Sequence, residues 1–335
     1  MSCYKNVVLD KSMYRVAGKG FSEVLEELDP SRGYDAEFSN MDAYQRQLKR
    51  FDIKVRDVNA DCIEKFFRTA QTATLFPEYV FRAVKAGAES VTALGDITAI
   101  KTQINGVDYR TIYGDDKTEQ EETINEGVEI PSVNVRLKEN LVKLNKSGQM
   151  LVASYEAVRN QKIELFTIML KQVGARIAKQ QFKSAVEVLV NGDEIIKSDV
   201  QTIEGDLAFE QLINLWNDFD DEYKMSTILV SSEMMKQLLQ LPEVMDAKSG
   251  FKFEIKNDAM MLLGAQLIKS NLVPKDLMIA LDKRFALEMV CSGDISIEHD
   301  KLIDKQLERS TIVSTYGFTR ICKPAVKILK FTATE

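Results

Sequence analysis

Apolar residues recur at helical spacing through residues 151–190 of the chain. The apolar stripe consists of Val158, Leu165, Met169, Val173, Ile177, Ala185, Val188 and Leu189. The opposite face carries Arg159, Lys162, Lys171, Arg176, Lys179 and Lys183. Only Gly174 interrupts the run before Asn191-Gly192, which is a natural helix end. The pattern predicts one helix of roughly 60 Å. Because the stripe is one-sided, we expect this helix to lie on a sheet or another layer.

Three short amphipathic stretches occupy residues 22–28, 41–51 and 61–67. Polar turns separate them, and Ser22 offers a helix cap at the start of the first stretch. None of them is long enough to build a core alone. The opening 70 residues are therefore predicted to be an arm that packs on something else.

The next predicted elements are a helix and a hairpin. Residues 78–91 have a helical pattern, with Pro77 placed just before the first turn. Residues 100–113 have the pattern strand, turn, strand, with Asn105-Gly106 near the middle. Asn-Gly between apolar runs is a strong signal for a hairpin turn.

A strongly acidic segment follows at residues 115–129, and a basic one comes soon after it. Opposite charges on a projecting loop or hairpin can pair with a neighbouring copy and guide its approach. The alternative is an ordinary solvated surface loop. The candidate inter-subunit residues are Asp115, Asp116, Glu119, Glu121, Glu122, Arg136, Lys138, Lys143 and Lys146.

From residue 200 onward the pattern is mixed helix and strand, which gives an α+β class. Helices are predicted at residues 208–218 and 233–240. Strands are predicted at residues 227–231, 262–270, 277–281, 286–290, 295–298, 310–318 and 325–331. The last strand is expected to tie the C-terminal region into a sheet.

Composition narrows the possible functions. The 335 residues are 45% hydrophobic with a net charge of −7, which argues against nucleic-acid binding as the main role. Four scattered cysteines (Cys3, Cys62, Cys291 and Cys322) favour a reducing compartment over a disulfide framework or zinc site. The first residues lack a signal-peptide pattern, and no apolar run is long enough to span a membrane.

The familiar catalytic patterns are missing from the sequence. The single histidine, His299, lies between acidic residues, and no Gly-x-Ser-x-Gly elbow is present. Gly18-Lys19-Gly20 lacks the rest of a phosphate loop. The acidic run at Asp218 lacks the glycine and final glutamate of a calcium loop. We therefore predict no catalytic, cofactor-binding or metal-binding residues, no cofactor, and no enzyme activity.

The order of these parts resembles a known family. Residues 75–84 read LFPEYVFRAV, the long predicted helix ends in VEVLVNGD, and the chain closes with KPAVKILKF. Together with the charged projection, this layout resembles the major capsid proteins of tailed bacteriophages, which have the Hong Kong 97 capsid fold. The likeness is most specific at residues 75–84 and 153–193.

The resemblance implies a division of the chain. Residues 1–70 would be an N-terminal arm or scaffold-like segment, 71–99 the N-arm, and 100–150 the extended loop. Residues 151–199 would be the spine helix and peripheral domain, 200–292 the axial domain, and 293–335 the closing strands of the peripheral domain. Some relatives lose an N-terminal segment to a protease, and some cross-link subunits through a Lys–Asn pair. That pair cannot be matched here.

The implied function is self-assembly into hexamers and pentamers of an icosahedral shell that encloses double-stranded DNA. The implied partners are other copies of the chain, a portal, scaffold or decoration proteins, and DNA bound without sequence preference, with no membrane. Such a protein is assembled in the host bacterial cytoplasm and resides in the virion. Two alternatives remain open at this point: an encapsulin-type nanocompartment shell, and an enzyme with an unrecognised carboxylate site.

Overall fold

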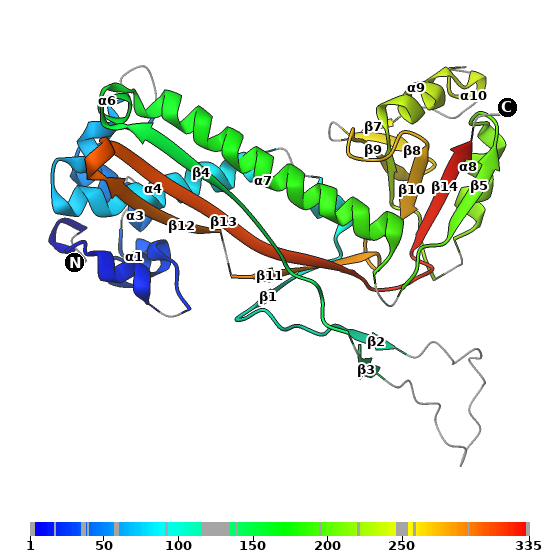
Figure 1. Cartoon of the computed structure of the whole chain (residues 1–335), viewed down its shortest axis with the longest axis horizontal. Helices are drawn as coiled ribbons and strands as arrows, with labels where there is room; N and C mark the ends of the chain where they lie inside the picture. Colours follow the sequence, from blue (N-terminus) through cyan, green and yellow to red (C-terminus); the bar gives the residue numbers. More distant parts are fainter. Residues whose placement is uncertain are drawn as a thin grey trace, which may run out of the picture. The chain divides into compact units, whose positions relative to one another are not determined.

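The computed structural model describes residues 4–16, 18–34, 38, 40–56, 60–90, 93–114, 135–138, 140–193, 196–219, 222–245, 254–256, 259–293 and 295–332. These residues form an α+β fold with two compact units (Figure 1). Unit 1 comprises residues 1–91, 148–178 and 295–314. Unit 2 comprises residues 92–147, 179–294 and 315–335.

Unit 1 begins with a helical segment, residues 4–67, which we call the N-terminal module. Its elements are η1 (Tyr4–Asn6), η2 (Lys11–Arg15), α1 (Phe21–Leu28), η3 (Ser31–Gly33), α3 (Ala43–Arg50) and η4 (Ile63–Phe67). The predicted second helix is confirmed as α3, and the Asp42 carboxylate caps it by accepting from Gln45 N at 2.7 Å. The first helix is confirmed as α1, but its N-cap is Gly20 and not Ser22.

Two longer helices form the centre of unit 1 (Figure 1). Helix α4 spans Ala70–Glu89 and α7 spans Ile163–Asn191, of which residues 163–178 belong to this unit. The predicted start of α4 at residue 78 is wrong, because the helix begins two turns earlier and contains Pro77. Thr69 supplies the true start, since its hydroxyl accepts a hydrogen bond from Thr72 N at 3.1 Å.

The predicted start of the spine helix at residue 151 is also wrong. Residues Asn145–Ser154 form strand β4, Tyr155–Asn160 form the short helix α6, and only then does α7 begin. Exposed and partly buried side chains alternate along β4, which is the period of a strand and not of a helix.

Helices α4 and α7 approach each other closely at two glycines. A Cβ built on Gly174 would lie 2.0 Å from the Val84 carbonyl oxygen, and one on Gly87 would lie 2.2 Å from the Lys171 carbonyl oxygen. No side chain fits at either position without a shift of backbone. The single glycine noted in the spine helix is therefore a packing requirement.

Strands complete unit 1. Strand β12 (Ser296–Leu302) pairs antiparallel with the first half of β13 (Leu307–Arg320), from Ser296 opposite Val313 to Leu302 opposite Leu307. The short η5 (Ile303–Lys305) joins them, and β4 also pairs with β13. Ile312 of β13 and residues of α4, α7 and the N-terminal module share one apolar core.

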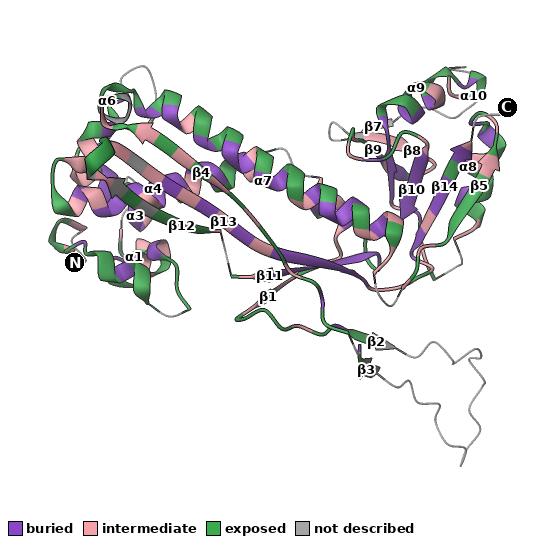
Figure 2. Cartoon of the chain, viewed as in Figure 1, coloured by how far each residue is buried: buried purple, intermediate pink, exposed green. Residues whose placement is uncertain are grey.

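Unit 2 is organised around a seven-stranded sheet, with the strand order β5-β14-β10-β6-β9-β8-β7. The strands are β5 (Val200–Glu204), β6 (Thr227–Val230), β7 (Glu254–Lys256), β8 (Ala259–Leu262), β9 (Ala265–Lys269), β10 (Leu277–Leu281) and β14 (Val326–Thr332). Both faces of the sheet are covered. Ile279 and its alternate neighbours pack with residues of α7, while Met278 and Ala280 pack with α8 (Phe209–Asn217) and α9 (Ser232–Gln240). Figure 2 shows β10 buried along its length.

Several other predicted elements are confirmed, and one of them, β13, runs from unit 1 into unit 2. They are the helices α8 and α9 and the strands β6, β10, β13 and β14. Ser231 caps α9, and the short α10 (Pro242–Met245) follows it. The predicted single strand at residues 262–270 is two strands, because Leu263 and Gly264 turn the chain with φ of 50° and 80°.

The predicted hairpin at residues 100–113 is wrong. After the short helix α5 (Leu94–Ile97), β1 (Ile100–Ile104) pairs in parallel with β11 (Leu287–Ser292), with Thr102 opposite Val290. The returning segment, β2 (Ile112–Gly114), pairs with β3 (Val135–Leu137) instead. Asn105-Gly106 does turn the chain, but partners distant in sequence satisfy the strands on both sides of it.

Candidate inter-subunit site

The described segments on either side of the charged stretch lie together in unit 2, where β2 pairs with β3 (Figure 1). We call residues 100–114 the first limb and residues 135–147 the second limb. Two backbone bonds extend the pairing, from Lys138 N to Thr111 O at 2.8 Å and from Val142 N to Tyr109 O at 2.9 Å. Backbone contacts therefore join the two limbs to each other.

A single carboxylate holds the first limb. Glu288 of β11 is buried, and its two oxygens accept hydrogen bonds from Thr102, Tyr109 and Thr111 at 2.6–2.7 Å. Burial and the hydrogen bond to Glu288 raise the pKa of Tyr109, so its hydroxyl stays a donor at neutral pH. Three hydroxyls satisfy a carboxylate that would otherwise be costly to bury.

A buried cation holds the second limb. The Lys138 side chain is only 2% exposed, and its ammonium donates to Arg320 O at 2.7 Å and to the Thr319 hydroxyl at 3.3 Å. Asp193, which follows α7, lies 3.5 Å from the same ammonium. The second limb is therefore bound to β13 by a charge that is paired and hydrogen-bonded.

Asp193 connects three segments. Its carboxylate accepts from Ile196 N at 2.6 Å, the Thr319 hydroxyl at 2.8 Å and Arg320 N at 3.0 Å. Burial alone would raise the pKa of Asp193, but these hydrogen bonds and the Lys138 charge lower it below its ordinary value. The carboxylate is thus ionised when it faces Lys138.

A close backbone approach also fixes the second limb against β13. A Cβ on Gly317 would lie 2.5 Å from the Lys143 carbonyl oxygen. Val142, beside it, is buried. The absence of a side chain at Gly317 lets the limb lie directly on the strand.

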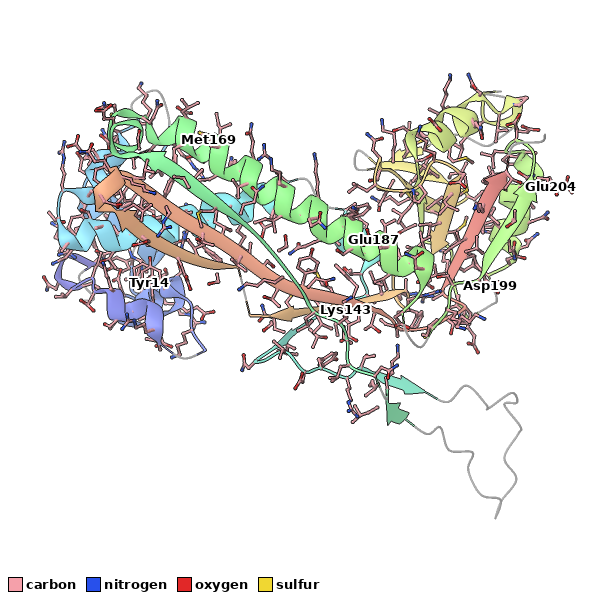
Figure 3. All side chains as sticks on the ribbon, in the orientation of Figure 1. Tyr14, Lys143, Met169, Glu187, Asp199 and Glu204 are labelled. Carbon is pink, nitrogen blue, oxygen red and sulfur yellow. The ribbon has the colours of Figure 1, made fainter. Side chains whose placement is uncertain are left out.

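A cavity of about 350 Å³ adjoins this second anchor. Lys138, Lys143, Asn145, Glu187 and Asp193 contribute polar groups to its lining, and Phe318 contributes an apolar one. Figure 3 labels Lys143 on the second limb and Glu187 on α7. The lining of the cavity is therefore mixed polar and apolar.

The predicted contact residues differ in where the structure places them. Asp115, Asp116, Glu119, Glu121 and Glu122 lie outside the described residues. Arg136 lies in β3, opposite Tyr113. Lys143 and Lys146 are exposed on the second limb, and their role in subunit contacts stays a prediction. Lys138 differs from the expectation, because it is buried and bound within its own unit.

Sequence reasoning missed Glu288 and the apolar surface of the limbs. Ile112 and Leu137 stand directly opposite each other in the β2–β3 pair, and they are 59% and 61% exposed. Val107 and Leu141 on the same limbs are also largely exposed. Alternating apolar residues gave a signal for strands, but not for which faces stay uncovered within one subunit.

No cluster of side chains for metal binding is found in the part of the chain that the structure describes. Within those residues, no three His, Cys, Asp or Glu side chains are grouped to hold a metal ion. Of the described helices, none is both long enough and apolar enough to cross a membrane.

No protein-family model matches the sequence, and no curated protein matches it. Solved structures do match the fold. The capsid of a native GTA particle is 14% identical, with a TM-score of 0.54 over 74% of this chain and 91% of that chain. The capsid of cyanophage P-SCSP1u is 12% identical, with a TM-score of 0.54 over 72% and 89%. The mature capsid of bacteriophage PhiM1 is 10% identical, with a TM-score of 0.50 over 69% and 85%. The chain therefore has the Hong Kong 97-like fold of tailed-phage major capsid proteins.

Proposed function

We propose that this chain is the major capsid protein of a tailed phage or prophage. The observation that carries the proposal is the capsid fold combined with a projection whose base is anchored on both limbs. A fixed base lets a long projection reach a neighbouring copy in one direction, which reduces the entropy lost on association.

In this proposal the subunits form hexamers and pentamers of an icosahedral shell around double-stranded DNA. The virion is its final location, and assembly takes place in the host bacterial cytoplasm. The further partners are a portal and, where the phage encodes them, scaffold or decoration proteins. The role is structural and not enzymatic, in keeping with the capsid neighbours.

The subunit contact is proposed to combine charge and apolar area. The exposed Lys143 and Lys146 and the acidic residues of the projection would steer the approach of a neighbour. The exposed pair Ile112 and Leu137 would be covered once the neighbour has docked. This division gives the charges a role in the association rate and the apolar pair a role in affinity.

The exposed face of α7 is proposed to lie toward packaged DNA. Arg176 and Lys179 are exposed, and Lys183 is only loosely paired with Glu187 at 3.8 Å. A sparse basic face binds phosphates without reading sequence. Such weak contacts suit DNA that is held by confinement.

Negative-stain electron microscopy of the chain expressed alone tests the proposed function. Uniform closed particles, or tubes and rings of capsomer size, are expected. If only small species form, co-expression with the scaffold protein of the same phage is the second arm, and small species there as well would overturn the proposal. Particles that carry an enzyme cargo and no DNA would instead identify the encapsulin-type shell.

A further inference from the structure

Helix α4 has a proline in its interior, and the N-terminal module contacts the helix at that point. Pro77 lacks an N–H, and its ring crowds the preceding turn, which weakens or bends a helix. The turn around it joins Thr74 to Glu78, which an uninterrupted helix connects by a hydrogen bond between N–H and carbonyl.

The Tyr14 hydroxyl stands between these two backbone groups. It accepts a hydrogen bond from Glu78 N at 3.1 Å and donates one to Thr74 O at 2.8 Å. Although Tyr14 is 36% exposed overall, its hydroxyl end is enclosed against the helix. Burial, followed by the nearby Glu78 charge, raises the pKa of Tyr14, so the hydroxyl keeps its proton.

A second tyrosine acts on the adjacent carbonyl. The Tyr44 hydroxyl of α3 donates to Leu75 O at 3.2 Å, and the Tyr44 ring is buried. Two side chains of the N-terminal module thus bind the turn just before Pro77. Phe66 of the module packs on the same helix, with ring centroids 5.6 Å from Phe76 and 5.3 Å from Tyr79.

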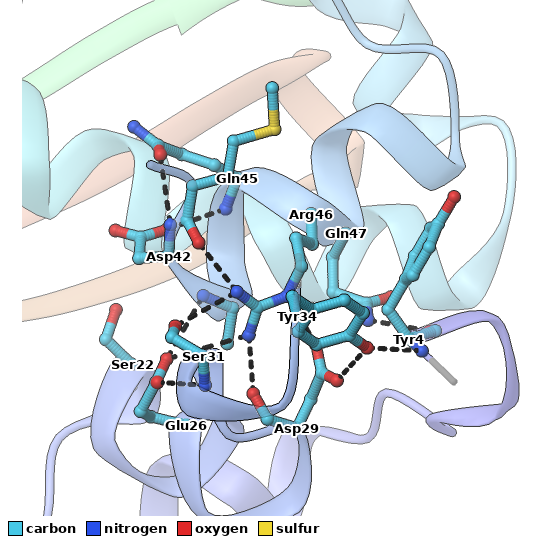
Figure 4. A network of polar contacts seen from close by, with 12 residues as sticks. Tyr4, Ser22, Glu26, Asp29, Ser31, Tyr34, Asp42, Gln45, Arg46 and Gln47 are labelled. Carbon is cyan, nitrogen blue, oxygen red and sulfur yellow. Dashed lines mark hydrogen bonds and ion pairs between the residues drawn. The ribbon is translucent and has the colours of Figure 1, made fainter. Parts of the chain in front are cut away.

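Charged groups hold the module in place around this contact. Arg82 of α4 donates to Glu78 at 2.8 Å, to Asp42 at the start of α3 at 2.5 Å, and to Ser22 of α1 at 2.6 Å. Inside the module, the fully buried Arg46 donates to the Asp29 carboxylate at 2.7 Å, to the Ser31 hydroxyl and to Met41 O (Figure 4). Charge-assisted hydrogen bonds therefore join the module to α4 and its parts to one another.

We propose that the N-terminal module is a permanent clamp on α4, which completes the helix at Pro77 and stays in the assembled protein. Removing it would uncover Leu75 and Phe76, which are buried, and withdraw the hydroxyls from Thr74 O and Glu78 N. The capsid neighbours cover about three quarters of this chain, which leaves enough uncovered sequence for the module to be an addition to the shared fold. The clamp itself belongs to the subunit, whereas its retention in particles rests on the proposed function.

Hydrogen exchange on the full chain tests the clamp. In Tyr14→Phe, the amides around Glu78 are expected to exchange about tenfold faster or more. Tyr4→Phe is the matched control, because within the described residues the Tyr4 hydroxyl has no hydrogen bond, and its exchange should equal that of the unmodified protein. Unchanged exchange in Tyr14→Phe would overturn the clamp. If that variant does not fold, Tyr44→Phe, which keeps the Tyr14 bridge, is compared in the same way at Phe76 to Tyr79.

Intact-mass spectrometry of purified particles tests retention. Every subunit is expected to keep residues 4–67, and subunits shortened by cleavage after the module would overturn the proposal. The two failures are distinguishable. If particles never form, the proposed function fails, while hydrogen exchange on the unassembled chain still decides the clamp.

Discussion

At the scale of single residues, each limb is held by a buried charge whose hydrogen-bonding groups all have partners. Glu288 receives three hydroxyls, and Lys138 has a carbonyl, a hydroxyl and a carboxylate. A buried charge costs several kcal/mol when it has no partner, so each anchor fixes one geometry by penalising the others.

Replacing Glu288 with alanine should lower the free energy of unfolding by about 2 kcal/mol, because three hydroxyls lose their acceptor. Urea unfolding followed by circular dichroism measures the change. Glu204→Ala is the control, since Glu204 is exposed on β5, and it should unfold like the original protein. Equal midpoints for the two variants would show that the first limb is held by other contacts.

The lowered pKa of Asp193 predicts that the free energy of unfolding depends on pH. Its folded pKa is lower than the unfolded value of 3.8, so the unfolded chain takes up the proton first as the pH falls. The contribution of Asp193 is present above the unfolded pKa and is lost as the pH falls through the folded one. Urea midpoints from about pH 6 to about pH 3 should fall less steeply in Asp193→Asn. Parallel curves would contradict the prediction.

At the scale of elements, sequence patterns located the strands that are buried on both faces and the helices that cover them. Strands β6 and β10 are short, nearly continuous apolar runs, which is the pattern expected of a strand buried on both faces. Residues 151–154 were misassigned because four apolar and small residues fit a helix as well as a strand. The partner strand that decides between them, β13, lies far along the chain.

The candidate site was less predictable for the same reason. The charges of residues 115–129 are visible in sequence, and their role in subunit contacts stays a prediction. Whether Lys138 is exposed or buried depends on Thr319 and Arg320, which are remote in sequence. Glu288 is one acid among many until the fold brings Thr102 and Thr111 to it. Local patterns carry no information about such pairings.

The crossing of α4 and α7 gives a prediction at this scale. In an open helix, Gly174→Ala would add about 1 kcal/mol of stability, because alanine has the higher helix propensity. Here the Cβ of the alanine would lie 2.0 Å from Val84 O and 2.8 Å from Ala88 N. The cost of this steric overlap exceeds the gain in helix propensity, so the free energy of unfolding is expected to fall by about 3 kcal/mol. Thermal unfolding measures it. Gly95→Ala in α5 is the control, since a Cβ there meets nothing within 4 Å.

At the scale of the whole molecule, the acidic segment at residues 115–129 is expected to be dispensable for folding. The described anchors and the β2–β3 pair lie outside residues 115–129. The limbs are therefore expected to stay paired when residues 115–129 are removed, because loop length has a small effect on stability. Folding and assembly should respond differently to changes in this segment.

Deleting residues 115–129 should leave the melting temperature of the subunit nearly unchanged and should prevent closed shells. The reason is that the charges proposed to pair with a neighbour are removed while the anchors remain. Light scattering and electron microscopy measure assembly. A Gly/Ser segment of the same length is the control for loop length, and it should also fail. Normal particles from either variant would show that the acidic segment has no role in pairing neighbours.

The division of the chain between the two units has a consequence for its synthesis. Each unit is assembled from three separate stretches, and the last stretch of unit 1 ends at residue 314. In unit 2, strand β10 is made before its partner β14, which ends at Thr332. Since chains emerge from the ribosome N-terminus first, neither unit can close while most of the polypeptide is still being made. Unit 1 is therefore complete only after residue 314 has been made, and unit 2 only after Thr332, so the early part of the chain remains without its final strand partners during most of its synthesis.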